Sequence, residues 1–140
     1  MAGRYVFTSD ALDTGSARAW LDLDGYTGFV PQPNPIAKSA ATTLLIAELL
    51  SGMIVVTGTA AVALTLPTGT LCDAGIAPAL AIDRGFFWSL VNGGTSLAAT
   101  TFLVGAGHTI VGSAVVGIGT SGLFLTRKTA ANTFITYRMA

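Results

Sequence analysis

Residues 85–126 read GFFWSLVNGGTSLAATTFLVGAGHTIVGSAVVGIGTSGLFLT and contain no Asp, Glu, Lys or Arg. Short runs of Val, Ile, Leu, Phe and Thr alternate with Gly-rich breaks, of which Asn92-Gly93-Gly94 is a strong turn signal. Strands that recur every ~8–12 residues between such turns are typical of an antiparallel sandwich or jelly roll. The stretch therefore predicts an all-β fold and offers no carboxylate for acid–base catalysis.

The same pattern continues on both sides of this stretch. We expect about eight strands, over residues 53–57, 61–66, 86–91, 97–104, 108–111, 114–118, 123–128 and 133–139. Residues 42–50 fit either a strand or a short helical turn, whereas residues 70–81 predict one short helix. The expected architecture is an all-β, antiparallel β-sandwich or jelly roll that occupies residues 41–140.

Both faces of several expected strands are apolar. Between residues 86 and 91 the even-numbered side chains, including Trp88, face one way, and the odd-numbered ones, including Phe87, face the other. An antiparallel sheet with one face in water should alternate cleanly between apolar and polar side chains. We therefore expect the second face to be covered as well, and in a chain this short we expect the cover to be another copy of the same chain.

Residues 1–40 have a different composition. They carry seven of the 14 charged residues (7 Lys and Arg, 7 Asp and Glu), and prolines stand at every second position from 31 to 35. This spacing of prolines forces an extended, polyproline-like path. We expect an extended N-terminal arm over residues 1–40. Its large aromatic side chains need cover from the parent domain or from a partner, and they are Tyr5, Phe7, Trp20, Tyr26 and Phe29.

The bulk composition indicates an assembly part. At 140 residues the chain is long enough for one domain with its own core. Only 10% of its residues are charged, compared with about 25% in typical domains. The formal net charge is zero, which excludes the basic footprint of a nucleic-acid-binding protein and favours self-association. The mean hydropathy of +0.67 is high for a soluble monomer, so we expect a subunit interface.

Export and membrane insertion are not expected. The first residues, MAGRYVFTSD, lack the apolar segment of a signal peptide, and the single Cys72 has no partner for an internal disulfide. We expect a buried thiol in a protein made in a reducing cytoplasm. Residues 49–72 are uncharged and long enough to cross a membrane, but Gly, Thr and Pro residues interrupt them and no positively charged flank sets an orientation.

Motifs that carry chemistry are incomplete in this chain. His108 is the single histidine and stands 36 positions after Cys72, so the two do not predict a zinc site. Residues 117–122 match GxGxxG, yet neither a helix nor an acidic residue follows, so we expect a hairpin turn there. Asp22 and Asp24 fit only the middle of a calcium loop, which predicts a solvated turn, with a looser calcium site as the alternative. We expect no enzyme activity, no cofactor and no metal.

Five stretches of the chain resemble a recurrent small structural protein of tailed bacteriophages. They are LSGMIVVT (50–57), AAVALTLPT (60–68), DRGFFWSLVN (83–92), GHTIVGS (107–113) and GTSGLFLTRKTAANTF (119–134). In these stretches the chain is similar to capsid decoration (cement) proteins, which are jelly-roll or β-sandwich domains, commonly trimeric, on the outer surface of the capsid. No position in the resemblance is catalytic, and residues 1–40 lie outside it.

The resemblance implies a virion structural protein that binds the outer surface of the phage head and stabilises it. Its partners would be the major capsid protein and further copies of itself in a homotrimer, and it would reach the capsid surface after synthesis in the host cytoplasm. Because aromatic side chains dominate interface hot spots, we expect the five arm aromatics to contact the capsid or a neighbouring subunit. A β-sandwich module of a phage tail or fibre, or one that binds a host receptor, is the alternative.

Overall fold

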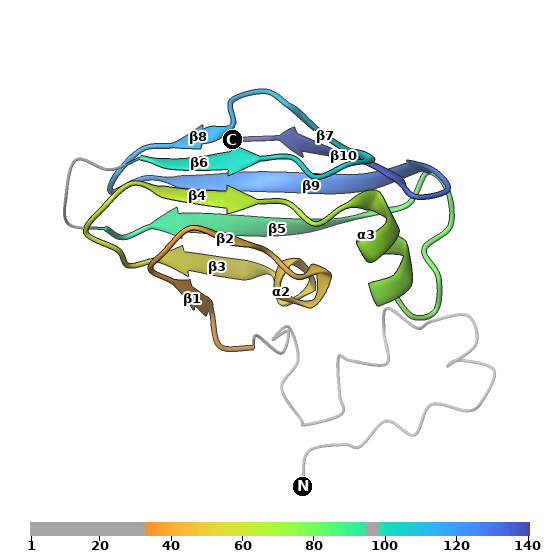
Figure 1. Ribbon diagram of the computed structural model, residues 1–140, viewed down its shortest axis with the longest axis horizontal. Helices are drawn as coiled ribbons and strands as arrows, with labels where there is room; N and C mark the ends of the chain where they lie inside the picture. Colours follow the sequence, from red (N-terminus) through yellow and green to blue (C-terminus); the bar gives the residue numbers. More distant parts are fainter. Residues whose placement is uncertain (1–32, 95–98) are drawn as a thin grey trace, which may run out of the picture. The chain divides into compact units, whose positions relative to one another are not determined.

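The computed structural model describes residues 33–94 and 99–140, which form two β-sheets that face each other and two short helices (Figure 1). Residues 33–140 make up one compact unit. Most of the expected arm lies outside the described residues, but Ile36–Lys38, near its expected end, forms the first strand of the larger sheet.

The described ranges contain ten strands and two helices. The strands are β1 (Ile36–Lys38), β2 (Thr42–Thr43), β3 (Met53–Val56), β4 (Val62–Thr65), β5 (Gly85–Asn92), β6 (Thr100–Leu103), β7 (His108–Val111), β8 (Val115–Val116), β9 (Ser121–Ala130) and β10 (Thr133–Arg138). The helices are α2 (Ile46–Leu50) and α3 (Gly69–Gly75). The expected strands correspond to β3 through β10, and the ambiguous residues 42–50 contain both a strand, β2, and a helix, α2.

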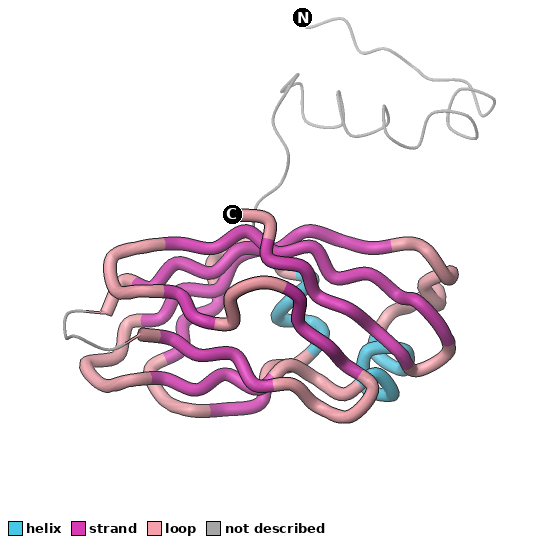
Figure 2. The backbone as a smooth tube through the Cα atoms, turned by 90° about the horizontal axis from the view of Figure 1, so that it is seen from above, coloured by secondary structure: helices cyan, strands magenta, loops and turns pink. Residues whose placement is uncertain are grey.

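From β1 to β9 successive strands alternate between the two sheets, and β10 then joins β9 in the larger one. The larger sheet has the order β1-β3-β5-β9-β10-β7, and the smaller one has the order β2-β4-β6-β8. Because the chain crosses to the opposite sheet after each of the first strands, β1, β3 and β5 run parallel, and so do β2, β4 and β6. These six strands therefore form three turns of a coil, and each turn places one strand in each of the two layers that Figure 2 shows.

The expectation of a purely antiparallel sandwich of about eight strands is wrong. Five of the eight described strand pairings are parallel, and three, β5–β9, β9–β10 and β6–β8, are antiparallel. The Gly-rich breaks end strands as expected, but several are corners between sheets. The hairpin turn expected at residues 117–122 is wrong, because this segment leads from β8 in the smaller sheet to β9 in the larger one. At one such corner Asn92 Nδ2 donates a hydrogen bond of 3.1 Å to the carbonyl oxygen of Val116, which belongs to the opposite sheet.

The expected helix over residues 70–81 is present but shorter. It begins at Gly69, where the Thr68 side chain accepts a hydrogen bond of 3.2 Å from the backbone N–H of Leu71, and it ends at Gly75. A proline cannot continue a helix because it has no N–H to donate, so Pro78 limits its length. In residues 33–94 and 99–140 no helix has both the length and the apolar character needed to cross a membrane.

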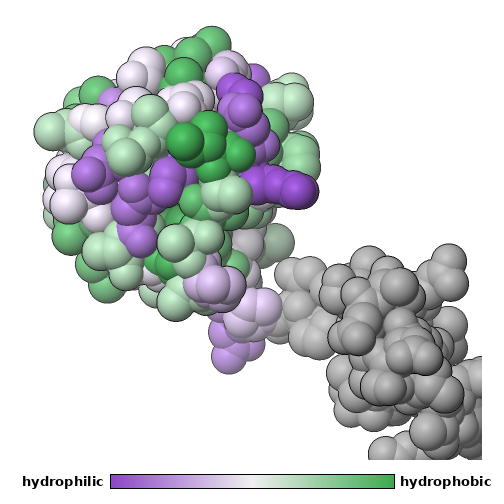
Figure 3. Space-filling view, turned by 90° about the vertical axis from the view of Figure 1, so that its right-hand side faces the viewer, coloured by the Kyte–Doolittle hydropathy of each residue, from purple (hydrophilic) through white to green (hydrophobic). Residues whose placement is uncertain are grey.

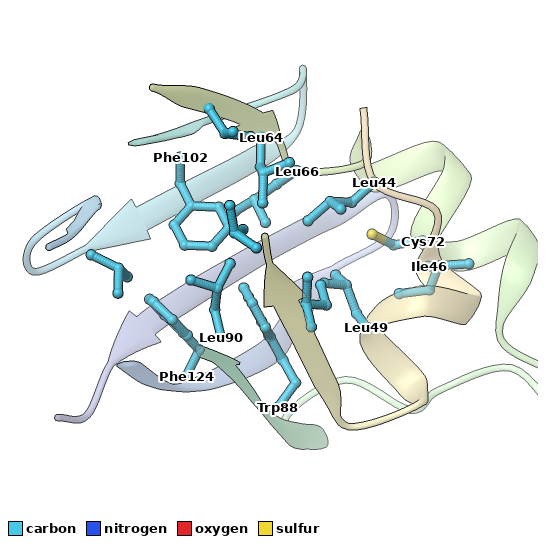
Figure 4. Packing of buried hydrophobic residues seen from close by; sticks show 14 of the residues in the cluster. Leu44, Ile46, Leu49, Leu64, Leu66, Cys72, Trp88, Leu90, Phe102 and Phe124 are labelled. Carbon is cyan, nitrogen blue, oxygen red and sulfur yellow. The ribbon is translucent and has the colours of Figure 1, made fainter. Parts of the chain in front are cut away.

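The hydrophobic core lies between the two sheets (Figure 4). The rings of Trp88 and Phe124 stack with their centroids 4.5 Å apart, and Phe102 of the smaller sheet meets both rings edge-on at 5.5 and 5.1 Å. Such aromatic pairs contribute about 0.5–1.5 kcal/mol each beyond the burial of their area. Leu64 and Leu90 are fully buried beside them. The core therefore joins the layers through three aromatic rings from β5, β6 and β9.

Candidate interaction face

The larger sheet presents an apolar face to the outside. We define the outer face as the side chains of β3, β5, β9, β10 and β7 that alternate with buried neighbours and point away from the smaller sheet. They are Met53, Val55, Phe87, Ser89, Val91, Ser121, Leu123, Leu125, Arg127, Thr129, Thr133, Ile135, Tyr137, Thr109 and Val111. Most of these side chains are aliphatic or aromatic, whereas a sheet face in water is normally polar.

Strand register places the outer-face side chains in rows. In the central row Phe87 is opposite Leu125, Leu125 is opposite Tyr137, and Tyr137 is opposite Val111. Side chains opposite one another on neighbouring strands have Cβ atoms about 4.5–5.5 Å apart, so the row is continuous across four strands. Phe87 is 59% exposed and Val111 47% exposed, and Leu123 of the next row is 41% exposed. Large apolar groups therefore remain in contact with solvent along the row.

The buried side of the same sheet carries most of its charge. The Lys128 ammonium of β9 points inward and lies 2.6 Å from Oδ1 of Asp73 on α3, and the Lys38 ammonium of β1 lies 2.5 Å from Oε1 of Glu48 on α2. The hydrogen bond from Lys128, with a second from the backbone N–H of Asn132, holds the pKa of Asp73 below its ordinary value. These pairs keep two lysines off the outer face.

Among the described side chains that define the outer face, Arg127 is the charged one. Its Nη2 donates to Oδ1 of Asp83, whose side chain is 69% exposed. An exposed pair of this kind contributes little to stability. It nevertheless leaves the outer face without an unpaired formal charge.

Strand β9 shows why the sequence alone does not identify the outer face. Alternation along Leu123-Phe124-Leu125-Thr126 places an apolar side chain on both sides of the strand. The buried side is decided by contacts with α3 and with the smaller sheet, which are distant in sequence. The sequence signals that Phe87 is on a second apolar face, but it carries no signal for the row, since a row depends on register between strands.

A chain of hydrogen bonds runs through the interior between the layers. Trp88 Nε1 donates to Thr126 Oγ1 at 2.8 Å, the Thr126 and Thr136 hydroxyls are 2.8 Å apart, and Thr136 Oγ1 lies 2.7 Å from Nε2 of His108. At the far end His108 Nδ1 lies 2.8 Å from the carbonyl oxygen of Pro67. The Pro67 carbonyl can only accept and the Trp88 indole can only donate. With a neutral imidazole, the Thr126 hydroxyl therefore donates to Thr136 and the Thr136 hydroxyl donates to Nε2 of His108.

The fold brings Cys72 close to His108, although the sequence places them 36 residues apart. The distance from Cys72 Sγ to His108 Nδ1 is 4.0 Å. Burial, with a smaller contribution from the charge of Asp73, raises the pKa of the thiol to about 12, and burial lowers the pKa of His108. A nucleophilic cysteine needs a lowered pKa and an imidazole that accepts its proton. Here Nδ1 already donates to Pro67, so the pair is suited to packing and not to catalysis.

The arm aromatics that the sequence predicts as the interface lie outside the residues that the structure describes. Tyr5, Phe7, Trp20, Tyr26 and Phe29 all precede residue 33, and so do the two aspartates of the calcium-like segment. In residues 33–94 and 99–140 no cluster of three or more His, Cys, Asp or Glu side chains is placed to hold a metal ion. Cys72 is buried, as the sequence predicts for this thiol.

The end of the molecule that carries α3 differs from the outer face. Figure 3 views this end, and hydrophobic residues there are interspersed with a band of hydrophilic ones. Its exposed apolar residues include Leu71 and Ile82, at 53% and 56%. In contrast, the central row of the outer face consists of four neighbouring apolar side chains.

Comparisons of the chain with models of protein families, with curated proteins and with solved structures found no match.

Proposed function

We propose that this chain is a virion structural protein of a tailed bacteriophage, a decoration protein that binds the outer surface of the capsid and stabilises it. The outer face of the larger sheet is the observation that carries the assembly role in this proposal, because a large apolar surface on a folded domain marks a site of protein contact. The sequence resemblance to decoration proteins supplies the class of assembly.

The stabilising mechanism in this proposal is the burial of apolar surface. Each contact removes apolar area from water at about 25 cal/mol per Å². A lattice of capsid subunits repeats that contact many times, and copies linked to one another bind with increased effective concentration. The proposed partners are the major capsid protein and two further copies of the chain. The arm aromatics Tyr5, Phe7, Trp20, Tyr26 and Phe29 are the proposed capsid anchor.

The proposal is tested by incubating the full-length chain with capsids of the virus that encodes it. Decoration predicts that the chain sediments with capsids and raises the temperature at which they open. A variant with serine at the five arm aromatics should keep the circular-dichroism spectrum of the natural chain and lose capsid binding. Full binding by this variant would contradict the role of the arm.

A failure of the unmodified chain to bind capsids would contradict the decoration function as a whole. The same preparation should then be tested for binding to host cells. Binding there would favour the alternative, a receptor-binding module of a tail or fibre.

A further inference from the structure

We infer that the outer face of the larger sheet is the contact between copies of this chain, so that the central row Phe87–Leu125–Tyr137–Val111 of one copy packs on outer-face side chains of another. The inference rests on the proposed function only for the number of copies, three, and otherwise stands on the geometry of the sheet. It assigns self-association to the sheet and leaves the arm aromatics for the capsid.

Charge is the first reason to choose a second copy as the partner. Any surface that meets itself brings its own charges together, and like charges in close contact are costly. The outer face avoids this because Lys128 and Lys38 turn away from it and pair with Asp73 and Glu48. Its remaining cation, Arg127, has its own carboxylate partner. Two outer faces can therefore meet without an unpaired like charge.

Area is the second reason. Five strands spaced about 4.8 Å apart and about six residues long at about 3.4 Å per residue cover a flat area of about 500 Å². A standard interface buries about 800 Å² on each partner, of which about 57%, or roughly 450 Å², is non-polar. The outer face therefore supplies much of the area that a stable contact between two copies requires, and most of its side chains are apolar.

Sheet geometry is the third reason. Two sheets pack face to face when regular rows of side chains interdigitate about 10 Å apart. The outer face has such rows, because the registers of β5, β9, β10 and β7 align Phe87 with Val111 across the sheet. Two identical faces that meet directly are related by a two-fold axis, whereas three faces around a three-fold axis each contact two neighbours through different parts of the face. The resemblance to decoration proteins favours three copies.

Two pairs of substitutions test the inference in the full-length chain. The face variant carries Phe87→Ser and Leu123→Ser, which replace outer-face side chains that are 59% and 41% exposed. The control variant carries Leu71→Ser and Ile82→Ser, which replace apolar side chains of similar exposure that belong to no strand of the larger sheet. Circular dichroism and the thermal midpoint, measured under conditions where each chain is monomeric, establish that each variant is folded.

Light scattering and sedimentation equilibrium over a range of concentrations, in low and in high salt, then give the mass in solution. We expect the natural chain and the control variant to form the same oligomer with little dependence on salt. The face variant should dissociate at concentrations about 100-fold higher or more, because each large apolar side chain lost from a buried contact raises the dissociation constant about tenfold or more.

Three results would overturn the inference: a natural chain that is monomeric at every concentration, a face variant that associates like the natural chain, or a control variant that dissociates equally. The result of the capsid experiment is independent of these three results. An oligomer that needs Phe87 and Leu123 but ignores capsids would contradict only the decoration function, and a dimer in place of a trimer would contradict only the expected number of copies. A monomer that binds capsids would contradict only the inference.

Discussion

The Nδ1 atom of His108 lies 2.8 Å from the carbonyl oxygen of Pro67, a residue 41 positions earlier in the chain. Since a carbonyl oxygen only accepts, Nδ1 carries the proton, and Nε2 accepts from the Thr136 hydroxyl at 2.7 Å. Protonating Nε2 would reverse the Thr136 hydroxyl and leave the Thr126 hydroxyl without its acceptor. The interior is therefore built around a neutral imidazole.

Stability should depend on pH through His108. Burial lowers the pKa of His108 below its ordinary value of 6.5, and the hydrogen bond to Pro67 offsets only part of that shift. Below pH 6.5 the unfolded chain binds a proton that the folded chain excludes. The contribution is therefore complete above pH 6.5 and is lost as the pH falls toward and through the lowered folded-state pKa. We expect a loss of at most about 1.4 kcal/mol per pH unit in urea titrations.

The matched control for this pH dependence is His108→Gln, which cannot titrate. Its unfolding free energy should change little between about pH 7.5 and about pH 5.5, where carboxylates stay ionised. The pKa values of Asp73 and Glu48 are lowered from 3.8 and 4.5, so these groups do not contribute in that range. An equal pH dependence in the natural chain and in His108→Gln would contradict the assignment to His108.

Cys72 should resist alkylation in the folded chain. Burial raises its pKa to about 12 from an ordinary value of 9.0. At a given pH this lowers the thiolate fraction about 1000-fold. We expect iodoacetamide to label Cys72 rapidly in urea and very slowly in buffer. Ala79→Cys adds an exposed thiol as an internal reference, and equal labelling rates for the two thiols would show that Cys72 is accessible.

Two buried threonines should respond in opposite ways to replacement by valine. Thr100 and Thr136 are both fully buried, but Thr100 Oγ1 has no hydrogen-bond partner among the described residues, whereas Thr136 bonds to Thr126 and His108. Removing an unsatisfied hydroxyl relieves a desolvation penalty. We therefore expect Thr100→Val to raise the unfolding free energy by about 1 kcal/mol and Thr136→Val to lower it by about 1–3 kcal/mol. Urea denaturation measures both, and the same sign for both variants would contradict the expectation.

Gly69 should be intolerant of a side chain. A Cβ at this position would overlap the carbonyl oxygen of Asn132 and lie 2.8 Å from that of Gly107. Although alanine favours helices over glycine, the overlap should dominate, and we expect Gly69→Ala to lower the unfolding free energy by about 1–3 kcal/mol. Gly117→Ala is the control, because its nearest atom would be 3.6 Å away. A stabilised Gly69→Ala variant would show that the turn at Asn132, between β9 and β10, moves away from the new side chain.

Strand positions were predictable from the sequence because they depend on local composition. The run Phe86–Val91 and the turn at Asn92 correspond to β5 and its end. The direction of pairing was predicted wrongly, because regular strand spacing and Gly-rich turns favour hairpins, whereas strands that are apolar on both faces are also typical of parallel sheets. The helix expected over residues 70–81 was placed correctly at its start and overextended beyond Gly75, because the alanine-rich tail suits a helix locally.

The sequence by itself determined that this chain is rich in strands, poor in charge and apolar on two faces of β5, because each of these properties is local or additive along the chain. Only the tertiary structure decided that strands β1 to β9 alternate between two sheets and that Lys128 turns inward to Asp73 while Leu125 joins Phe87 and Tyr137 outside. The physical reason is that register and burial are set by contacts between segments distant in sequence, which no local pattern encodes.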